Sequence, residues 1–490
     1  MKTALTGPVR VRFAPSPTGF LHVGGARTAI YNDLLRQSLG GSFILRIEDT
    51  DRARSDEAMI EQIRSALAWV GVTWDEGPFL QSEGVERHRQ AAHELITAGH
   101  AYPCTVSPEA LEEKRREAQK RGEELRYRDV FPRPTAEQVA QVLSSGEPYA
   151  IRFKSGDADV RFHDLVRGEV TFPATTLDDF IILRTDGSPT YHLSVVCDDV
   201  EMRITHVIRG EDHISNTPKH IELFRALGSQ PPVFGHLPLI LGPDRKRLSK
   251  RTGAASVEEF RDQGMLPAAV YNYLVLLGWS PGEDREVMTR EEMIALFTVE
   301  RLNASAAVFD PEKLRWMNAQ YLMSTPIPEL LPYLEPFLVP LGLGGLQGAQ
   351  RERLLAVLDL HRTRARTLQE LAPQLVPYFR ERLSYDADAC AKFLNQPHLP
   401  AHLQQLADAY SRLEPFAVDT LEAELRRLAT ELGLKAGDLI HPTRMALSGE
   451  QKGPPLFDLV AIMGREATLR HLGNFASFLQ ESAMEAGTLL

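Results

Sequence analysis

The amino-acid sequence predicts an α/β protein that has a Rossmann-like parallel-sheet domain, an inserted α+β segment and an all-α C-terminal half. Strand and helix signals alternate up to about residue 240, which is typical of a parallel sheet covered by helices. Charged helical signals and short strand signals interrupt this alternation between about residues 105 and 190. Strand signals are almost absent after about residue 330. Because 490 residues exceed what one hydrophobic core usually holds, we expect several domains.

The first predicted unit is a strand, a helix and a second strand. VRVRFAPS is typical of a buried strand that enters a Pro/Gly turn. In the following helix, GGARTAIYNDLLRQSL, the apolar residues Ala26, Ile30 and Leu34 lie at helical spacing, and Gly40 and Gly41 end the helix. SFILRIEDTD predicts the second buried strand. Since such βαβ crossovers build parallel sheets, we expect ligands at the carboxyl ends of these strands.

The remaining elements follow in order. The insertion begins with the charged helical piece EALEEKRREAQKRGEELR and continues with short strands around YAIRFK, DVRFHDLV and FIILRTDG. Parallel-sheet signals resume with ITHVIRGEDH and the helix TPKHIELFRALG. Beyond about residue 255 the amphipathic segments AAVYNYLVLLGW, RERLLAVLDLHRTRARTLQELAPQLVPYF and DTLEAELRRLATELGL predict a mainly helical chain.

Composition restricts the class of protein. With 43% hydrophobic and 25% charged residues the chain is typical of globular proteins, and no stretch approaches the ~20 apolar residues of a membrane span. The N-terminus lacks the apolar core of a secretory signal, so we expect a cytoplasmic protein that has no membrane partner. Cys104, Cys197 and Cys390 are too few and too scattered for a disulfide framework or a zinc knuckle. The net charge of −11 does not exclude local basic patches, which are what contact RNA.

The first motif with chemical content is RFAPSPTGFLHVGGAR, which begins at Arg12 and lies between a predicted strand and a helix N-terminus. Gly19, Gly24 and Gly25 let the backbone approach a ligand closely, and the helix N-terminus offers N–H groups to anionic oxygens. His22 supplies a further donor. A Gly/Pro turn with a satisfied histidine is the structural alternative for a lone HVGG, but the whole motif favours a phosphate site.

The second motif is RLSKR, at residues 247–251, within a basic loop. Arg245, Lys246, Arg247, Lys250 and Arg251 fall within seven consecutive residues. Neighbouring cations repel one another unless an anion is present, so this loop favours polyphosphate binding over an ordinary solvated loop.

Together these motifs resemble the nucleotide-binding signatures of class I aminoacyl-tRNA synthetases, in the form PSPTGxLHVGG found in the glutamate-specific family. The family's second signature histidine is Gly25 here, which leaves His22 near the ATP phosphates. Arg247 replaces the first lysine of the mobile loop, so Lys250 is the expected transition-state contact. The resemblance implies that His22 and Lys250 are catalytic and that ATP is bound by Thr18, His22, Gly24, Gly25, Asp212, Ile240, Arg247, Leu248, Ser249, Lys250 and Arg251.

The amino-acid pocket expected by resemblance fits a dicarboxylic substrate, which needs two cationic partners for its carboxylates and one anion for its ammonium. Arg12 would pair with the side-chain carboxylate and Glu48 with the ammonium, while Tyr191 and Arg209 would complete the site. The full expected glutamate site is Arg12, Phe13, Ala14, Ser16, Glu48, Tyr191 and Arg209. Each residue alone is more often a member of a surface ion pair, so the set depends on joint placement at strand ends.

The implied function is ATP-dependent ligation of L-glutamate to tRNA(Glu) through a glutamyl adenylate, with ATP and Mg²⁺ required. Glutamylation of a modified tRNA nucleoside and a non-catalytic RNA-binding role are the alternatives. Helices in place of C-terminal β-barrels favour glutamate over glutamine as the substrate. With Cys104 alone where relatives cluster cysteines, we predict no structural zinc.

The resemblance also assigns domains. A catalytic domain in two halves, 1–104 and 191–242, is split by an acceptor-stem-binding insertion, 105–190. A stem-contact domain carrying the RLSKR loop, 243–325, and a helical anticodon-binding domain, 326–490, follow. In the last of these, LHRTRARTL aligns with a segment that reads the anticodon, and both Arg362 and Arg364 are candidates, with a solvated helix face as the alternative. We expect a monomer.

Overall fold

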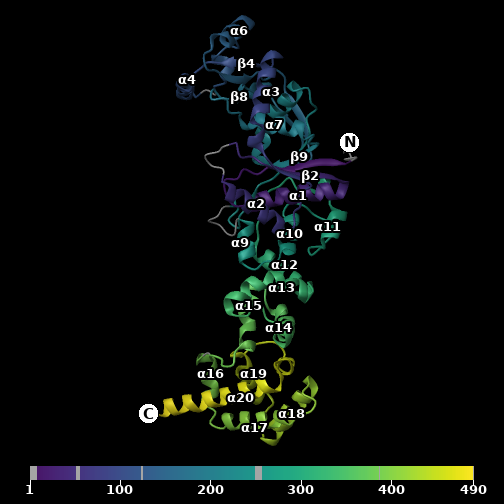
Figure 1. Cartoon of the computed structure of the whole chain (residues 1–490), viewed down its shortest axis with the longest axis vertical. Helices are drawn as coiled ribbons and strands as arrows, with labels where there is room; N and C mark the ends of the chain where they lie inside the picture. The colour runs from purple at the N-terminus through teal and green to yellow at the C-terminus, as the bar shows by residue number, and fades with distance from the viewer. Residues whose placement is uncertain (1–7, 51–55, 123–124, 249–255, 386, 489–490) are drawn as a thin grey trace. The chain divides into compact units, whose positions relative to one another are not determined.

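The computed structural model describes residues 8–50, 56–122, 125–248, 256–385 and 387–488. It contains two compact units, Met1–Phe260 with Pro267–Pro311 and Arg261–Leu266 with Glu312–Leu490. The five domain segments expected from the sequence stay a prediction, and the packing of the chain divides it into two units only. Figure 1 shows strands and helices in the N-terminal part of the chain and helices in the C-terminal part.

The first unit is built on parallel strands, as predicted. One sheet has the order β1–β2–β3 and a second has the order β7–β6–β10–β9. The strands are β1 (Val9–Phe13), β2 (Gly41–Ile47), β3 (Glu76–Leu80), β6 (Val160–Asp164), β7 (Gly168–Phe172), β9 (His206–Gly210) and β10 (Val233–Leu237). The sheets meet at β1, where Thr205 N donates to Arg10 O at 2.9 Å just before β9. Parallel pairing of β1 with β2 and of β9 with β10 aligns their carboxyl ends.

Helices follow the strands in the first unit. They are α1 (Val23–Leu39), α2 (Glu57–Trp69), α3 (Val85–Thr97), α7 (Tyr191–Glu201), α8 (Thr217–Ala226), α9 (Val257–Asp262), α10 (Pro267–Leu276) and α11 (Arg290–Leu296), with the short strands β11 (Ile240–Leu241) and β12 (Ala307–Val308). Helix α1 buries Ala26, Ile30 and Leu34, the three residues whose spacing predicted it. It ends at Gly40, whose φ of 72° suits glycine.

The inserted segment is not structurally separate from the sheet that contains β9 and β10. Its elements are α4 (Pro108–Arg121), α5 (Tyr127–Val130), α6 (Ala136–Ser145), β5 (Ala150–Phe153), β6, β7 and β8 (Phe180–Leu183). Strand β5 lies between β4 (Ala101–Cys104) and β8 in an antiparallel sheet. The β6–β7 hairpin instead joins β10, so the insertion contributes two strands to the sheet that contains β9 and β10.

Local sequence explains where the helices of the insertion start. Ser107 accepts from Ala110 N ahead of Pro108, and Gly122 ends α4 in the left-handed conformation. Thr135 and Gln138 form a reciprocal capping box at α6. These caps satisfy N–H groups that would otherwise lack partners at the first turn.

In the second unit, all regular elements of the described residues are helical. They are α12 (Pro311–Ser324), which begins in the first unit, α13 (Ile327–Leu338), α14 (Gly348–His361), α15 (Leu368–Leu375), α16 (Ala387–Leu394), α17 (Leu399–Ser411), α18 (Val418–Glu431), α19 (Gly437–Ser448) and α20 (Leu456–Thr488). Helix α20 contains a break at Gly464, whose φ is 78°. The predicted all-α C-terminal half is therefore confirmed, as is the α/β class of the N-terminal half. Within the described ranges, every helix is too short or too polar to cross a bilayer.

The short 3₁₀ helices are Gln81–Gly84, Ala174–Thr176, Glu211–Asn216, Val299–Arg301, Val339–Leu341, Arg362–Arg364 and Val376–Phe379. The amphipathic stretch at 351–379, which the sequence pattern treats as one helical segment, is interrupted by Arg362–Arg364 and ends in Val376–Phe379. Thr367 accepts from Glu370 N at 3.2 Å and so begins the new helix α15.

Candidate active site

The carboxyl ends of four parallel strands open into one cleft of about 400 Å³ in the first unit. Ala14 follows β1, Glu48 follows β2, Asp212 follows β9 and Pro238 follows β10. Strand order alone therefore brings together residues that lie far apart in the sequence. The residues predicted from the sequence that line this cleft are Arg12, Phe13, Ala14, Ser16, His22, Gly24, Gly25, Glu48, Tyr191, Arg209, Asp212, Ile240, Arg247 and Leu248.

The loop between β1 and α1 forms one wall of the cleft. Glu48 N donates to Pro15 O at 3.0 Å and ties this loop to β2. His22 is the N-cap of α1, and its Nδ1 accepts from Gly24 N at 3.1 Å, so Nε2 is the ring nitrogen that carries the hydrogen. A Cβ at Gly25 would lie 3.2 Å from Leu21 Cδ1, so close packing favours glycine there. The helix N-terminus gives this wall a partial positive charge.

Arg12 lies on β1 and is 4% exposed. Its Nε donates to Asp199 Oδ1 at 3.3 Å, and Asp199 also accepts from Arg46 Nη1 at 2.7 Å. In the part of the chain that is described, Asp199 is the hydrogen-bond partner of the Arg12 side chain. The terminal amino groups of Arg12 are therefore the part of the guanidinium available to a ligand carboxylate.

Glu48 contributes a carboxylate to the same cleft. Arg46, which is fully buried, lies 3.6 Å from Glu48 and also contacts Asp198 and Asp199. Burial raises the pKa of Glu48, and the Arg46 charge opposes that shift. An ionised Glu48 facing the cleft is a suitable partner for an ammonium group.

Arg209, on β9, is surrounded by neutral acceptors. Its Nη2 donates to Thr217 Oγ1 at 2.8 Å and to His213 O at 3.3 Å, its Nε donates to His236 Nε2 at 3.1 Å, and its Nη1 lies 3.3 Å from His220 Nδ1. Burial lowers the pKa of Arg209 and takes that of His220 well below its usual range. Among the described residues, no carboxylate pairs with Arg209, so this buried cation favours an anionic ligand.

Tyr191, at the start of α7, presents its hydroxyl to the cleft beside His213 Nδ1, at 3.1 Å. Burial raises the pKa of Tyr191 to about 12, so its phenol stays protonated at neutral pH. Burial also lowers the pKa of His213 to about 4, which keeps the imidazole neutral. This pair offers hydrogen bonds without adding charge.

The remaining predicted ATP-binding residues have different positions. Thr18 lines an adjoining depression of about 930 Å³, which shares Ser16, Glu48 and Tyr191 with the cleft. Arg247 and Leu248 line the cleft, and Leu248 N donates to Ile240 O at 3.0 Å. Ser249, Lys250 and Arg251 lie outside the described residues.

The two candidate anticodon residues lie in the second unit and differ in their contacts. Arg362 donates to Thr325 O at 2.8 Å and pairs with Asp359 at 2.8 Å. Arg364 has no ion-pair partner in the described part of the chain. It lines a pocket of about 250 Å³ that also contains His361, Gln374, Pro377, Tyr378, Ser448, Glu450, Lys452 and Gly453.

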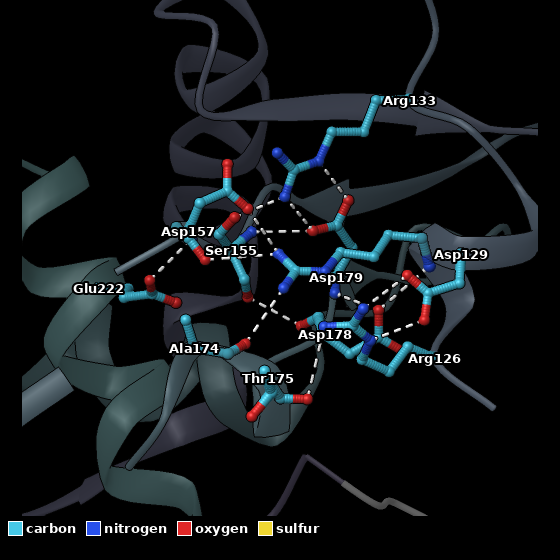
Figure 2. A network of polar contacts seen from close by, with 12 residues as sticks. Arg126, Asp129, Arg133, Ser155, Asp157, Ala174, Thr175, Asp178, Asp179 and Glu222 are labelled. Carbon is cyan, nitrogen blue, oxygen red and sulfur yellow. Dashed lines mark hydrogen bonds and ion pairs between the residues drawn. The ribbon is translucent and has the colours of Figure 1, made fainter. Parts of the chain in front are cut away.

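Around Cys104 the insertion is held by hydrogen bonds and ion pairs. Cys104 Sγ lies 3.1 Å from Tyr127 Oη. Figure 2 shows the adjoining network, in which Arg133 bonds to the buried Asp179 at 2.6 and 2.8 Å. Asp178 in turn accepts from Tyr127 N.

Within the described ranges, no three His, Cys, Asp or Glu side chains are grouped as metal ligands.

Several residues that shape the cleft had no clear signal in the sequence. Asp199 and Arg46 bind each other beneath Arg12 and Glu48, and His220 and His236 hold Arg209. His236 lies on β10, a strand that was not predicted from the sequence. His220 lies on a helix and Asp199 on another, so their roles depend on tertiary packing.

Comparisons with known proteins agree with this geometry. A family model described as "tRNA synthetases class I (E and Q), catalytic domain" matches residues 8–316, and one described as "Anticodon binding domain" matches residues 329–476. The glutamate–tRNA ligase 2 of Koribacter versatilis is 44% identical over 96% of this chain and 98% of its own length. The glutamate–tRNA ligase of Geobacter sulfurreducens is 44% identical over 96% and 99%.

A solved structure supports the same assignment. The crystal structure of a glutamate tRNA ligase from Elizabethkingia meningosepticum, in complex with its amino acid, has a TM-score of 0.85 and 34% identity, and the match covers 96% of this chain and 99% of that one. Because relatives named glutamate–tRNA ligase align along almost their whole length with this chain, the comparisons favour glutamate charging over the two alternatives considered from the sequence. Both the catalytic and the anticodon-binding parts are matched, and the chain belongs to the glutamate–tRNA ligases, a family of class I aminoacyl-tRNA synthetases that charges tRNA with glutamate for protein synthesis.

Proposed function

We propose that this cleft activates L-glutamate with ATP and that the resulting glutamyl adenylate esterifies tRNA(Glu). The observation that carries the proposal is the placement of Arg12, Arg209 and Glu48 around one cleft. Two buried guanidinium groups match two carboxylates, and one carboxylate matches one ammonium. A free dicarboxylic amino acid has this set of charges.

Each charged group of glutamate has its own partner in this proposal. Arg12 binds the side-chain carboxylate through its terminal amino groups, since Asp199 holds only Nε. Arg209 and the Tyr191 hydroxyl complete the site around the α-carboxylate, and Glu48 binds the ammonium. The backbone and side chains of Phe13, Ala14 and Ser16 line the same wall. Glutamine is rejected because a neutral amide leaves the terminal amino groups of Arg12 without an anionic partner.

ATP occupies the side of the cleft formed by the N-terminus of α1. We assign the phosphates to His22, Gly24 and Gly25, because the helix N-terminus and an imidazole donor favour anionic oxygens. Thr18, Asp212, Ile240 and the RLSKR residues Arg247, Leu248, Ser249, Lys250 and Arg251 complete the proposed ATP site. Mg²⁺ usually keeps several waters and is held through substrate phosphates, so a dedicated cluster of protein ligands is not required.

The chemistry proposed has two steps. An oxygen of the glutamate α-carboxylate attacks the α-phosphorus of ATP, the bond to the β-phosphate breaks, and pyrophosphate leaves. A hydroxyl of the terminal adenosine of tRNA(Glu) then attacks the carbonyl carbon, and AMP leaves. Charge develops on phosphoryl oxygens in the first step, so positioned donors and cations stabilise its transition state. Lys250 of the RLSKR motif is the proposed cation.

The cellular setting belongs to the same proposal. We infer that the enzyme acts in the cytoplasm, as a monomer, with tRNA(Glu), L-glutamate and ATP as its partners and without structural zinc. Arg364 is the favoured anticodon contact, because Arg362 is already engaged by Asp359 and Thr325 O.

Aminoacylation assays test the proposal. Labelled glutamate and labelled glutamine are each offered with tRNA(Glu) and tRNA(Gln) transcripts, with ATP and Mg²⁺. We expect glutamate, but not glutamine, on tRNA(Glu). Charging of tRNA(Gln) with glutamate as well would make the enzyme non-discriminating. ATP consumption with glutamate but without charging of either tRNA would contradict the second step.

A further inference from the structure

A buried carboxylate from the insertion lies behind Arg209. Asp164 ends β6, and its side chain is fully buried. Its Oδ1 accepts from the backbone N–H groups of Val166, Arg167 and His236, at 3.0, 3.0 and 3.2 Å. Its Oδ2 lies 2.6 Å from His236 Nδ1. Both carboxylate oxygens of Asp164 therefore have hydrogen-bond partners that fix its orientation.

These contacts determine which nitrogen of His236 carries the hydrogen. Burial alone would raise the pKa of Asp164, but the hydrogen bond from His236 and the backbone N–H groups outweigh it and lower that pKa. The ionised carboxylate accepts only, so His236 Nδ1 must donate to it. Nε2 is then left with a lone pair. Arg209 Nε, which can only donate, faces that lone pair from 3.1 Å, and Thr217 Oγ1 lies 3.0 Å from His236 Nε2 as well.

The same hairpin contacts the other side of the site. Arg167, in the β6–β7 turn, pairs with Glu211, which directly follows the strand that carries Arg209. Glu211 also accepts from Leu239 N at 2.7 Å, and Leu239 lines the cleft. Thus two neighbouring residues of the insertion, Asp164 and Arg167, contact residues next to the proposed amino-acid site.

We propose that Asp164 and His236 are positioning residues for substrate binding: Asp164 fixes the tautomer of His236, and His236 fixes the orientation of the Arg209 guanidinium in the cleft. This inference rests on the proposed assignment of Arg209 to a glutamate carboxylate. Holding Nε from behind fixes the plane of the guanidinium. The terminal amino groups then lie at a defined angle to the bound carboxylate, which is also the nucleophile.

The D164N variant tests this chain of hydrogen bonds without a large change in shape. Three backbone N–H groups surround the Oδ1 position, so the amide oxygen must stay there and the NH₂ group must face His236 Nδ1. Nδ1 then has to accept, the hydrogen moves to Nε2, and that N–H opposes Arg209 Nε–H. We expect the KM for glutamate in aminoacylation to rise roughly tenfold to a hundredfold. The KM for ATP should stay within about twofold of wild type.

Two variants of His236 separate its two hydrogen bonds. H236Q places an amide oxygen near the position of Nε2 and keeps an acceptor for Arg209, whereas H236N reaches only the position of Nδ1 and keeps the bond to Asp164. We expect H236Q to retain a KM for glutamate closer to wild type than H236N does. The opposite order would overturn the proposal, and this comparison decides it even if D164N does not fold.

D179N is the matched control, because Asp179 is also a buried carboxylate of the insertion and binds Arg133 (Figure 2). It should lower thermal stability without changing the KM for glutamate. If D164N and D179N raise that KM equally, Asp164 has only a structural role and the proposal fails. R209Q distinguishes the assignment of Arg209 to a glutamate carboxylate from the positioning role of Asp164 and His236. A normal KM in R209Q would refute the assignment of Arg209 itself, whereas a raised KM in R209Q with a normal KM in D164N would refute only the positioning role.

Discussion

Arg12 and Arg209 are both buried beside one cleft, but their charges are balanced differently. Arg12 donates through Nε to Asp199, whereas Arg209 is held by a threonine, a backbone carbonyl and two neutral histidines. An arginine with a built-in anion remains in place without a ligand. One with neutral partners gains most of its electrostatic stabilisation when an anion binds. We therefore expect glutamate to stabilise the protein against heat, and Arg209 to contribute most of that effect.

Replacing Arg12 with glutamine should weaken the choice between glutamate and glutamine. The substrate side-chain carboxylate would lose its charged partner, which corresponds to roughly tenfold to a hundredfold in kcat/KM for glutamate. The measurement is kcat/KM for both amino acids in aminoacylation. R10Q is the matched control, because Arg10 lies two residues earlier on β1 and pairs with the partly exposed Glu76. Equal losses in R10Q and R12Q would contradict the assignment.

Glu48 should make kcat/KM for glutamate fall at acidic pH. Burial raises the pKa of Glu48, so this carboxylate becomes protonated at a higher pH than an ordinary glutamate does. A protonated Glu48 no longer attracts the substrate ammonium, so kcat/KM for glutamate should fall as the pH decreases through that raised pKa. A pH profile of kcat/KM measures the pKa in the free enzyme. In E48Q this acid limb should disappear and kcat/KM should be low throughout; an unchanged limb would assign it to another group.

The sequence predicted the residues that line the cleft better than it predicted the residues that hold them in place. Arg12, Glu48 and Arg209 were assigned by resemblance to the family, and parallel strands bring the strand ends that carry them together. Asp199 and His220 were missed because each lies on a helix within a largely apolar pattern. Their partners come from distant strands, and no local pattern specifies such contacts.

At the scale of elements, the β6–β7 hairpin shows the same limit. Strand β6 was expected from DVRFHDLV, whereas β7 was not predicted, and a strand signal does not state which strand is the neighbour. The structure pairs Asp164 with Phe234 of β10, so the hairpin extends the catalytic sheet. The insertion is therefore anchored in two sheets, β4–β5–β8 and β7–β6–β10–β9.

Asp179 should make the stability of the insertion depend on pH. Burial by itself would raise the pKa of Asp179, but hydrogen bonds from Arg133 and Tyr102 outweigh burial and lower it. A lowered pKa stabilises the folded state above the unfolded-state pKa of about 3.9, and this contribution is lost as the pH falls through the folded-state pKa. D179N should lose roughly 3 kcal/mol at pH 7. Its melting temperature should fall less steeply than that of wild type below about pH 5.

Thermal unfolding at pH 7 and at about pH 2.5 measures this difference. D157N is the control, because Asp157 is 80% exposed at its side chain and pairs with Arg128. Such an exposed pair contributes about 0–1 kcal/mol, so D157N should resemble wild type at both pH values. Parallel melting curves for D179N and wild type across this pH range would contradict the role given to Asp179.

At the scale of the whole molecule, chemistry and anticodon recognition are assigned to different units. The residues that line the cleft all belong to the first unit, whereas Arg362 and Arg364 belong to the second. The matched family models divide the chain in a similar way, at residues 8–316 and 329–476. Substitutions in the cleft should therefore change the kinetic parameters for glutamate. Substitutions of the anticodon candidates in the second unit should change those for tRNA.

Arg364 provides the sharpest test of this division. Its pocket contains His361 and Tyr378, and Arg362 is held by Asp359 and Thr325 O, so Arg364 is the better placed of the two candidates to contact an unstacked anticodon base. R364Q should reduce discrimination between tRNA(Glu) transcripts that differ in the third anticodon base by roughly tenfold. Its KM for glutamate should be normal.

R362Q and R366Q serve as controls for that measurement. R362Q removes a contact that holds the end of α14, so it should lower stability without changing the preference for the third base. Arg366 is an exposed partner of Glu312, and its loss should have little effect on either quantity. If R362Q, and not R364Q, alters the preference for the third base, the contact belongs to Arg362, and the ion pair with Asp359 must open when tRNA binds. If all three variants raise the KM for tRNA equally without changing base preference, this segment contributes charge to phosphate binding and does not recognise the base.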